Sequence, residues 1–270
     1  MRGDNIFNDL KMKKDWALIL GGSSGLGLAT AKKLVKHGFH CIIVHRDRRA
    51  DLEKIKRDFD EIMSHGALFK AFNTNALNSE KRMALINEMT TLLPVDHKIK
   101  VLVHSIAKGS LKPMFAIEQE TLTNQDLKIT FEAMALSLYD WTTALANANL
   151  FAEDARIISF TSEGNKKVMA NYAAVSVAKV ALEALTRSIA LEFAPIGIKA
   201  NCIQAGITQT KSFEMIPGYQ KNKSDALKRN PNNRLTTPED VANVVYLLTM
   251  DEAKWITGTV IKVDGGESLR

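Results

Sequence analysis

The sequence is short of the features that mark secreted, membrane and metal-binding proteins. Its 270 residues include only two cysteines, each in a strand-like apolar run, which suggests neither a disulfide framework nor a metal site. No apolar run approaches the ~20 residues that a transmembrane helix needs. Residues 1–14 are polar and contain no apolar signal stretch. We therefore expect a cytoplasmic protein with no membrane or metal partner, in which Cys41 and Cys202 are small core residues.

The sequence also has only a small excess of one charge sign. The formal net charge is +6 and the isoelectric point is near 9.2, a mild basic excess that suits an acidic or phosphorylated ligand. Aromatic residues make up 7% of the chain and do not interleave with a basic stripe. A nucleic-acid partner is therefore not expected.

The chain does contain a regular alternation of short apolar runs and longer stretches with helical periodicity. This alternation predicts a single α/β domain over residues 1–270, a Rossmann-type doubly wound parallel sheet of seven strands with helices on both faces. The length is ample for such a core. The expected strands are 16–20, 41–44, 67–72, 100–103, 156–160, 198–204 and 260–263.

Three segments stand apart from this alternation. Residues 1–13 form an N-terminal extension, and 124–146 has the apolar periodicity of one long helix. Periodicity fails from 211 to 234, apart from a short amphipathic piece at 224–228. Long irregular loops inside a compact domain often act as lids, so residues 207–233 are expected to cover a substrate site.

A glycine-rich turn joins the first strand to the helix that follows it. Gly21 permits a tight turn, Gly25 lets the backbone approach a pyrophosphate, and Gly27 allows the helix to pack closely on the strand. The helix N-terminus supplies N–H donors to the anion. Strand, glycine turn and helix in this order predict a nucleotide site.

The end of the second strand indicates which nucleotide is bound. NAD-selective folds place an acidic residue there, whereas this chain has His45 and Arg46 with further arginines behind them. Guanidinium groups bind phosphate through paired donors, which favours the 2′-phosphate of NADPH over NADH. Asp47 leaves an alternative, because a register slip of two residues would bring its carboxylate to the ribose.

Tyr172 and Lys179 share one face of an apolar helix that runs to Leu191. They are about two helical turns apart, and side chains lean toward the helix N-terminus, so the ammonium should reach back toward the phenol. A nearby cation makes a phenol a better proton donor. Alone, this spacing also fits an exposed tyrosine and a solvated lysine.

These motifs together resemble those of the short-chain dehydrogenases/reductases over about residues 14–269. Gly21-x3-Gly25-x-Gly27 matches the nucleotide turn of that family. Residues 234–242 and 257–266 match its C-terminal pattern.

Where the chain departs from the usual family pattern, its motifs resemble those of one branch, the enoyl-acyl-carrier-protein reductases. The usual Tyr-x3-Lys is Tyr-x6-Lys here, and the usual Asn-Asn-Ala-Gly is His-Ser-Ile-Ala at 104–107. The usual Pro-Gly is Ala205-Gly206, and Glu132 stands at the place of the helix asparagine of the proton relay. The glycine turn and lid most resemble the NADPH-using Bacillus-type subgroup.

The resemblance implies reduction of the trans-2 double bond of an enoyl thioester in fatty-acid elongation, with hydride delivered to the β-carbon. Tyr172 would donate a hydrogen bond to the enolate oxygen, and Lys179 would bind the nicotinamide ribose. Ser159, Phe160 and Ser162 stay open as the upstream residue that assists Tyr172. The residues expected to contact NADPH are Gly21, Ser23, Ser24, Gly25, Leu26, Gly27, His45, Arg46, Asn75, Ser105, Ile106, Ala107, Lys179, Ala205, Gly206, Ile207 and Thr210.

The lid offers two kinds of side chain to such a substrate. Its apolar residues suit an acyl chain and its basic residues suit an acidic acyl carrier protein, with coenzyme A as the other carrier. The resemblance also implies a homotetramer. The apolar set is Phe213, Met215, Ile216 and Tyr219, and the basic set is Lys221, Lys223, Lys228 and Arg229.

Two other functions stay open. A 3-ketoacyl or other carbonyl reductase of the same family would use the tyrosine to protonate an alkoxide, although Tyr-x3-Lys would then be expected. A protein that senses NADP without turnover would keep the fold, although the intact Tyr172 and Lys179 speak against it.

Overall fold

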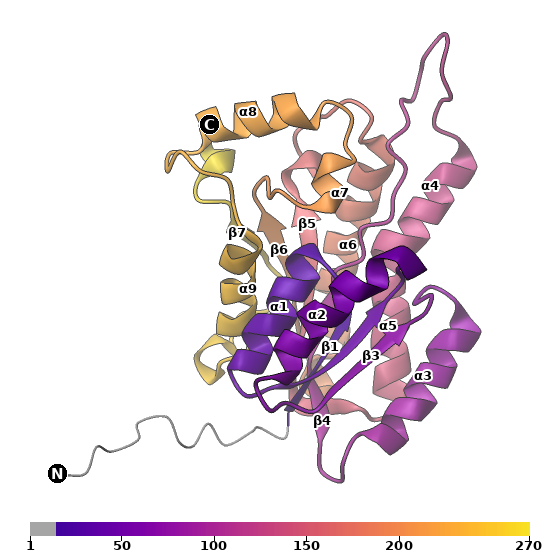
Figure 1. Cartoon of the computed structure of the whole chain (residues 1–270), viewed down its shortest axis with the longest axis vertical. Coiled ribbons are helices and arrows are strands. Elements are labelled where there is room, and N and C mark those ends of the chain that lie inside the picture. Colours follow the sequence, from indigo (N-terminus) through magenta and orange to yellow (C-terminus); the bar gives the residue numbers. More distant parts are fainter. Residues whose placement is uncertain (1–14) are drawn as a thin grey trace, which may run out of the picture.

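A computed structural model describes residues 15–270, so the predicted extension at 1–13 lies outside the described residues. The described chain forms one parallel seven-stranded sheet in the order β3-β2-β1-β4-β5-β6-β7, with helices on both faces (Figure 1). The predicted doubly wound fold is confirmed. Its strands are β1 Asp15–Leu20, β2 His40–His45, β3 Phe69–Asn73, β4 Lys98–His104, β5 Phe151–Ser162, β6 Lys199–Ala205 and β7 Val260–Val263.

The strand order determines where a ligand-binding crevice lies. Strand β1 lies between β2 and β4, so the chain crosses over the sheet between β3 and β4 and leaves a crevice at the carboxyl ends of β1 and β4. Ligands of doubly wound sheets bind at such a switch point. Residues of β1 alternate between the two faces: Trp16 and Leu18 pack on one side, Ala17 and Ile19 on the other.

Each face of the sheet carries its own set of helices. Helices α1 Gly25–Lys36, α2 Leu52–Met63 and α9 Pro238–Leu247 cover one face, and α3 Ser79–Leu92, α5 Ser137–Asn147 and α6 Ala173–Glu192 cover the other. Local sequence sets several ends. Helix α1 ends at Lys36, and Gly38 (φ +88°) follows its C-cap. Thr237 caps α9 by a reciprocal pair of hydrogen bonds with Asp240. Cys41 and Cys202 are free cysteines buried in the core, as predicted.

The expected single helix over 124–146 is wrong in detail. The chain forms α4 Asn124–Phe131, a π-helical segment Glu132–Leu136 and then α5. Glu132 is exposed and lines neither of the two cavities described below. Helix α6 begins at Ala173, and Tyr172 is its N-cap with φ −110° and ψ 3°. The Asn78 side chain caps α3 by accepting a hydrogen bond from the Lys81 backbone N–H.

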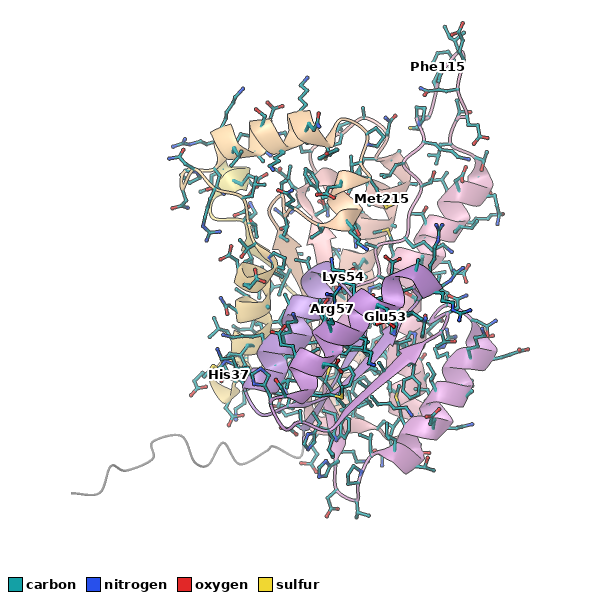
Figure 2. All side chains as sticks on the ribbon, viewed as in Figure 1. His37, Glu53, Lys54, Arg57, Phe115 and Met215 are labelled. Atoms are coloured by element: carbon teal, nitrogen blue, oxygen red, sulfur yellow. The ribbon has the colours of Figure 1, made fainter. Side chains whose placement is uncertain are left out.

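The lid also differs from its prediction. Where irregular structure was expected, the chain forms α7 Lys211–Glu214 and α8 Tyr219–Arg229, and α8 lies across the top of the molecule beside the C-terminus (Figure 1). In Figure 2, Met215 marks the turn between α7 and α8, and Phe115 marks the tip of the long loop between β4 and α4. Across residues 15–270, no helix has the length and hydropathy to span a membrane.

Candidate active site

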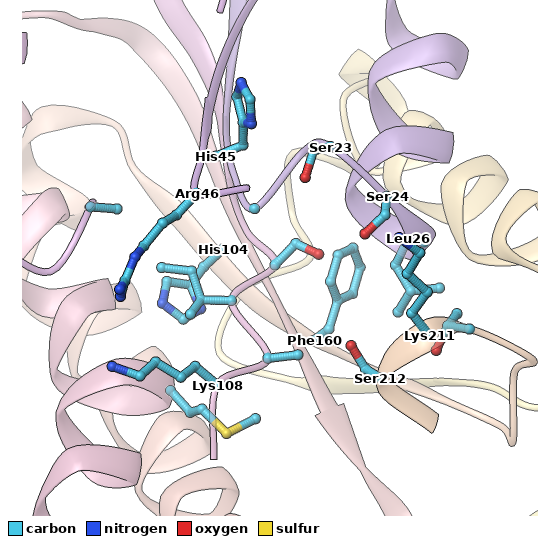
Figure 3. Close-up of a pocket in the computed structure, with 18 of the residues that line it drawn as sticks. Ser23, Ser24, Leu26, His45, Arg46, His104, Lys108, Phe160, Lys211 and Ser212 are labelled. Carbon is cyan, nitrogen blue, oxygen red and sulfur yellow. The ribbon is translucent and has the colours of Figure 1, made fainter. Parts of the chain in front are cut away.

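A cavity of about 630 Å³ opens at the carboxyl ends of β1, β4 and β5 (Figure 3). It runs from the glycine turn past the loop after β4 to Tyr172 and Lys179. Most residues predicted from sequence to bind a cofactor meet there. Those lining the cavity are Gly21, Ser23, Ser24, Gly25, Leu26, His45, Arg46, Asn75, Ser105, Ile106, Ala107, Lys179 and Thr210.

The glycine turn is shaped for close backbone approach. Gly21 has φ +84°, and a Cβ built there would lie 2.5 Å from the Ser105 carbonyl oxygen. A Cβ on Gly27 would lie 2.3 Å from the Gly21 carbonyl oxygen, so only glycine lets the helix pack on its own turn. Gly25, at φ +55°, faces more open space, its nearest neighbour being the Thr210 side chain at 3.5 Å. Gly27 supports the cavity without lining it.

The N-terminus of α1 is free to bind an anion. Ser24 is its N-cap but makes no side-chain cap hydrogen bond, which leaves the first-turn N–H groups available. Figure 3 shows the Ser23 and Ser24 hydroxyls beside the cavity. The uncapped helix end, the glycine turn and the length of the cavity fit a dinucleotide with its pyrophosphate at α1.

At the far end of the cavity, the two residues at the end of β2 differ in their burial and contacts. His45 is buried and its Nδ1 pairs with Asp47 Oδ2 at 2.8 Å, and the Asp47 backbone N–H donates to Asn73 Oδ1 at 3.0 Å. Arg46 is exposed and extends in another direction from the His45 ring (Figure 3). His45 thus lines the cavity and holds Asp47 beside it, and Arg46 and Arg48 are exposed cations at the same end.

Tyr172 lies at the other end of the cavity and is 9% exposed. Burial raises the pKa of its phenol, and a hydrogen bond with Ser162 offsets part of that rise. The sequence predicted that a nearby cation would make this phenol a better proton donor, but burial is the largest effect and the pKa is raised. A phenol with a raised pKa stays protonated at neutral pH and acts as a hydrogen-bond donor.

Lys179 is buried, and its Nζ donates to the Phe160 carbonyl oxygen at 2.7 Å. Burial lowers its pKa to about 8, against the opposing effect of the Glu183 carboxylate one helical turn further on. An ammonium has three donors, so two remain for a ligand. Lysine and tyrosine share the cavity as predicted, but a strand carbonyl holds the lysine.

The alternation of β5 separates the three candidates for the upstream residue. Ser159 is wrong as a site residue: it points into the core, where its Oγ lies 3.0 Å from Cys202 Sγ and 3.3 Å from Thr186 Oγ1. Phe160 lines the cavity but has no hydroxyl. Ser162 lines the cavity with Tyr172 and its hydroxyl lowers the pKa of the phenol, so it is the candidate for the upstream partner that the geometry favours.

Two buried polar residues of the site had escaped assignment. His104 lines the cavity, its Nε2 lies 2.7 Å from Ser137 Oγ, and burial lowers its pKa to about 3, so the ring is neutral. Glu183 accepts from Thr161 Oγ1 at 2.7 Å and from Asn165 Nδ2, which fixes the segment after β5. The signals were a histidine at the end of β4 and a glutamate in the middle of an apolar helix.

A second cavity of about 600 Å³ adjoins the first and shares Ser162 and Tyr172 with it. The lid helices and the loop after β4 form much of its wall, and Ala205, Gly206 and Ile207, predicted to contact the cofactor, line this cavity instead. Its apolar lining includes Leu111, Met134, Met169, Val175, Phe213 and Ile216. Within residues 15–270, no group of three or more His, Cys, Asp or Glu residues is placed to hold a metal ion.

A family model for enoyl-(acyl carrier protein) reductase matches residues 21–268. The chain belongs to this family. Its members are short-chain dehydrogenases/reductases, so the protein is an oxidoreductase with an enoyl-acyl-carrier-protein reductase-like domain.

Individual relatives align with nearly the whole length of this oxidoreductase. The subunit BbsD of (2S)-[(R)-hydroxy(phenyl)methyl]succinyl-CoA dehydrogenase from Thauera aromatica is 27% identical over 256 residues, 94% of this chain and 96% of that protein. A short-chain dehydrogenase from Burkholderia cenocepacia, solved in complex with NADP, superposes with a TM-score of 0.80 at 23% identity, covering 96% and 99% of the two chains. The enoyl-[acyl-carrier-protein] reductase (NADH) from Aquifex aeolicus gives 0.79 at 24% identity, covering 96% and 98%. Both solved structures share the fold described above.

Proposed function

We propose that the protein reduces the trans-2 double bond of an enoyl thioester with NADPH. One observation carries the proposal: the Tyr172 phenol, with Ser162 beside it, stands where the dinucleotide-shaped cavity meets an apolar cavity under the lid. The family model supports the same substrate class. A nicotinamide cofactor in the first cavity would supply the hydride.

The residues around the junction suit this reaction. Hydride addition to the β-carbon leaves negative charge on the thioester oxygen, and the protonated Tyr172 phenol would donate a hydrogen bond to it. Ser162 would orient that phenol. Lys179, fixed on the Phe160 carbonyl, would offer its two remaining N–H donors to ribose hydroxyls and keep the site positive. Burial by the lid would strengthen these contacts by excluding water.

The preference for NADPH rests on Arg46. Its exposed guanidinium at the end of β2 would bind the 2′-phosphate, while the Asp47 carboxylate, which also lines the cavity, is paired with His45. The Burkholderia cenocepacia relative was solved with NADP, whereas the Aquifex aeolicus reductase is named for NADH.

The carrier of the acyl group would meet the outer side of the lid. Lys228 and Lys221 are exposed on α8, although Lys221 also lines the second cavity, and both would face an acidic acyl carrier protein or the phosphates of coenzyme A. Lys223 bonds Gln209 at 2.7 Å, and Arg229 is engaged by carboxylates, so the basic set is smaller than predicted. The proposal includes a cytoplasmic location, a role in fatty-acid elongation and a homotetramer, as the family resemblance implies.

A carbonyl reductase is the second candidate. Two hydroxyls, from Ser162 and Tyr172, meet at one point, and such a pair also suits an alkoxide. The Thauera aromatica relative is itself named a dehydrogenase.

One assay tests both candidates. NADPH oxidation is followed with crotonyl and acetoacetyl thioesters side by side, and crotonyl thioester should turn over faster. Faster turnover of the acetoacetyl thioester would establish the second candidate instead. NADPH binding without oxidation of either substrate would indicate a cofactor-sensing protein.

A further inference from the structure

The lid is tied to the rest of the molecule at both of its ends by one buried carboxylate. Glu267, in the C-terminal turn Glu267–Leu269, is 2% exposed. Its Oε2 accepts from the Ile207 backbone N–H at 3.0 Å, where the lid begins. Its Oε1 accepts from Arg229 Nη2 at 2.8 Å, where α8 ends. A single side chain therefore closes the loop that carries α7 and α8.

Arg229 carries this connection on to the catalytic segment. Its Nη1 lies 3.0 and 3.2 Å from the two carboxylate oxygens of Glu163, which follows Ser162 directly. The next residue, Gly164, packs so closely on the phenol that a Cβ there would lie 2.6 Å from Cε1 of the Tyr172 ring. The lid is thus linked through one guanidinium to the turn that supports the tyrosine.

The ionic balance makes Arg229 the critical member of this group. Burial raises the pKa of Glu267, and the carboxylates of Glu163 and Asp264 push in the same direction, whereas the Ile207 N–H and Arg229 oppose them. Arg229 and Glu163 are partly buried, at 19% and 25% exposure of their side chains. Loss of the guanidinium would leave two carboxylates facing each other beside the cavity, which is unfavourable in a partly desolvated site.

We propose that Arg229 is a positioning residue that holds the lid over the acyl cavity and couples the lid to the Tyr172 segment through Glu267 and Glu163. Arg229, Glu163 and Glu267 line the second cavity and none of them lines the first. The group therefore acts on the acyl substrate more than on the dinucleotide. Its effect on turnover rests on the proposed function, but its effect on the lid does not.

The central experiment compares Arg229→Gln with Arg234→Gln. Arg234 makes the same kind of ion pair, to Asp240, but it lies just outside the lid and its side chain is 58% exposed. Two readouts are measured: the rate at which trypsin cleaves the lid at Lys221, Lys223 and Lys228, and the kinetic constants with crotonyl thioester.

For Arg229→Gln, we expect lid cleavage and the KM for the thioester each to rise about tenfold, the size of a typical coupling between sites, while the Kd of NADPH stays within about twofold. Arg229→Lys keeps the charge but reaches only one carboxylate, so both changes should be intermediate. Arg234→Gln should behave as the wild type. Because Glu163 and Arg229 act together, adding Glu163→Gln to Arg229→Gln should change KM by less than Glu163→Gln does alone.

Equal lid cleavage in Arg229→Gln and wild type would overturn the proposal, as would an effect of Arg234→Gln of the same size. Lid cleavage is measured without substrate, so a protein that turned over no enoyl thioester would refute the proposed function and leave this test decisive. Should Arg229→Gln fail to fold, Glu163→Gln serves, since it keeps Glu267 paired. That variant should raise KM about threefold, less than the change expected for Arg229→Gln, and an unchanged KM would count against the coupling.

Discussion

Lys179 should cost the protein stability at neutral pH, and the cost should be measurable without any substrate. Burial lowers its pKa from 10.5 to about 8. By linkage this shift corresponds to about 3 kcal/mol, because the native state at pH 7 must hold a charge that its interior disfavours. Lys179→Met replaces the ammonium by an apolar side chain of similar length. After allowing about 1 kcal/mol for the lost hydrogen bond to the Phe160 carbonyl, the variant should be about 2 kcal/mol more stable at pH 7.

The pH dependence gives the sharper test. As the pH rises from 8 to 10.5, native Lys179 loses its proton before the unfolded chain does, so the wild type gains stability. Between pH 7 and pH 10 this gain is about 2.5 kcal/mol, and Lys179→Met lacks it. The lead of the variant should therefore shrink by that amount. Urea unfolding of both proteins at the two pH values measures it.

The control is Lys54→Met, a change of the same kind on the outer face of α2, where Figure 2 labels Lys54. It should stay within about 0.5 kcal/mol of the wild type at both pH values. If the stability difference between Lys179→Met and wild type were the same at pH 7 and pH 10, the lysine would not carry a depressed pKa, and the account of its burial would fail.

Two further predictions concern the site directly. Ser162→Ala should lower kcat by about tenfold, because the Tyr172 phenol loses its orienting hydroxyl, whereas Ser159→Ala should leave kcat unchanged because that side chain lies in the core; steady-state kinetics on both variants decides, and equal effects would contradict the assignment. Arg46→Ala should raise the Kd of NADPH about tenfold and leave that of NADH nearly unchanged, and titration of both cofactors would refute the phosphate contact if the two shifts were equal.

Much of the fold and half of the site follow from local sequence. The seven-strand alternation, the glycine turn and the stop at Gly38 are each encoded within a few residues, and all of them appear in the structure. The cofactor cavity could be predicted for the same reason, because parallel strands bring their carboxyl ends together once the alternation is known.

The parts that escaped prediction depend on residues far apart in the chain. The polar lid sequence looked irregular, but α8 is anchored by Glu267 and Glu163, which lie 38 and 66 residues from Arg229. The break between α4 and α5 is a π-helical segment inside a continuous apolar pattern. The alternation of β5 separates Ser159 from Phe160 and Ser162, but which of the two faces meets the cavity depends on how β5 packs, and the sequence does not determine this.

The central claim is that the Tyr172 phenol stabilises the oxygen of a reacting enoyl thioester. It is tested most directly by the turnover of crotonyl thioester by Tyr172→Phe, with NADPH binding measured on the same protein. Removing one preorganised donor of this kind commonly costs about 10²–10³ in kcat, so we expect at least that loss with a nearly unchanged Kd for NADPH. Wild-type turnover in the phenylalanine variant would contradict the account.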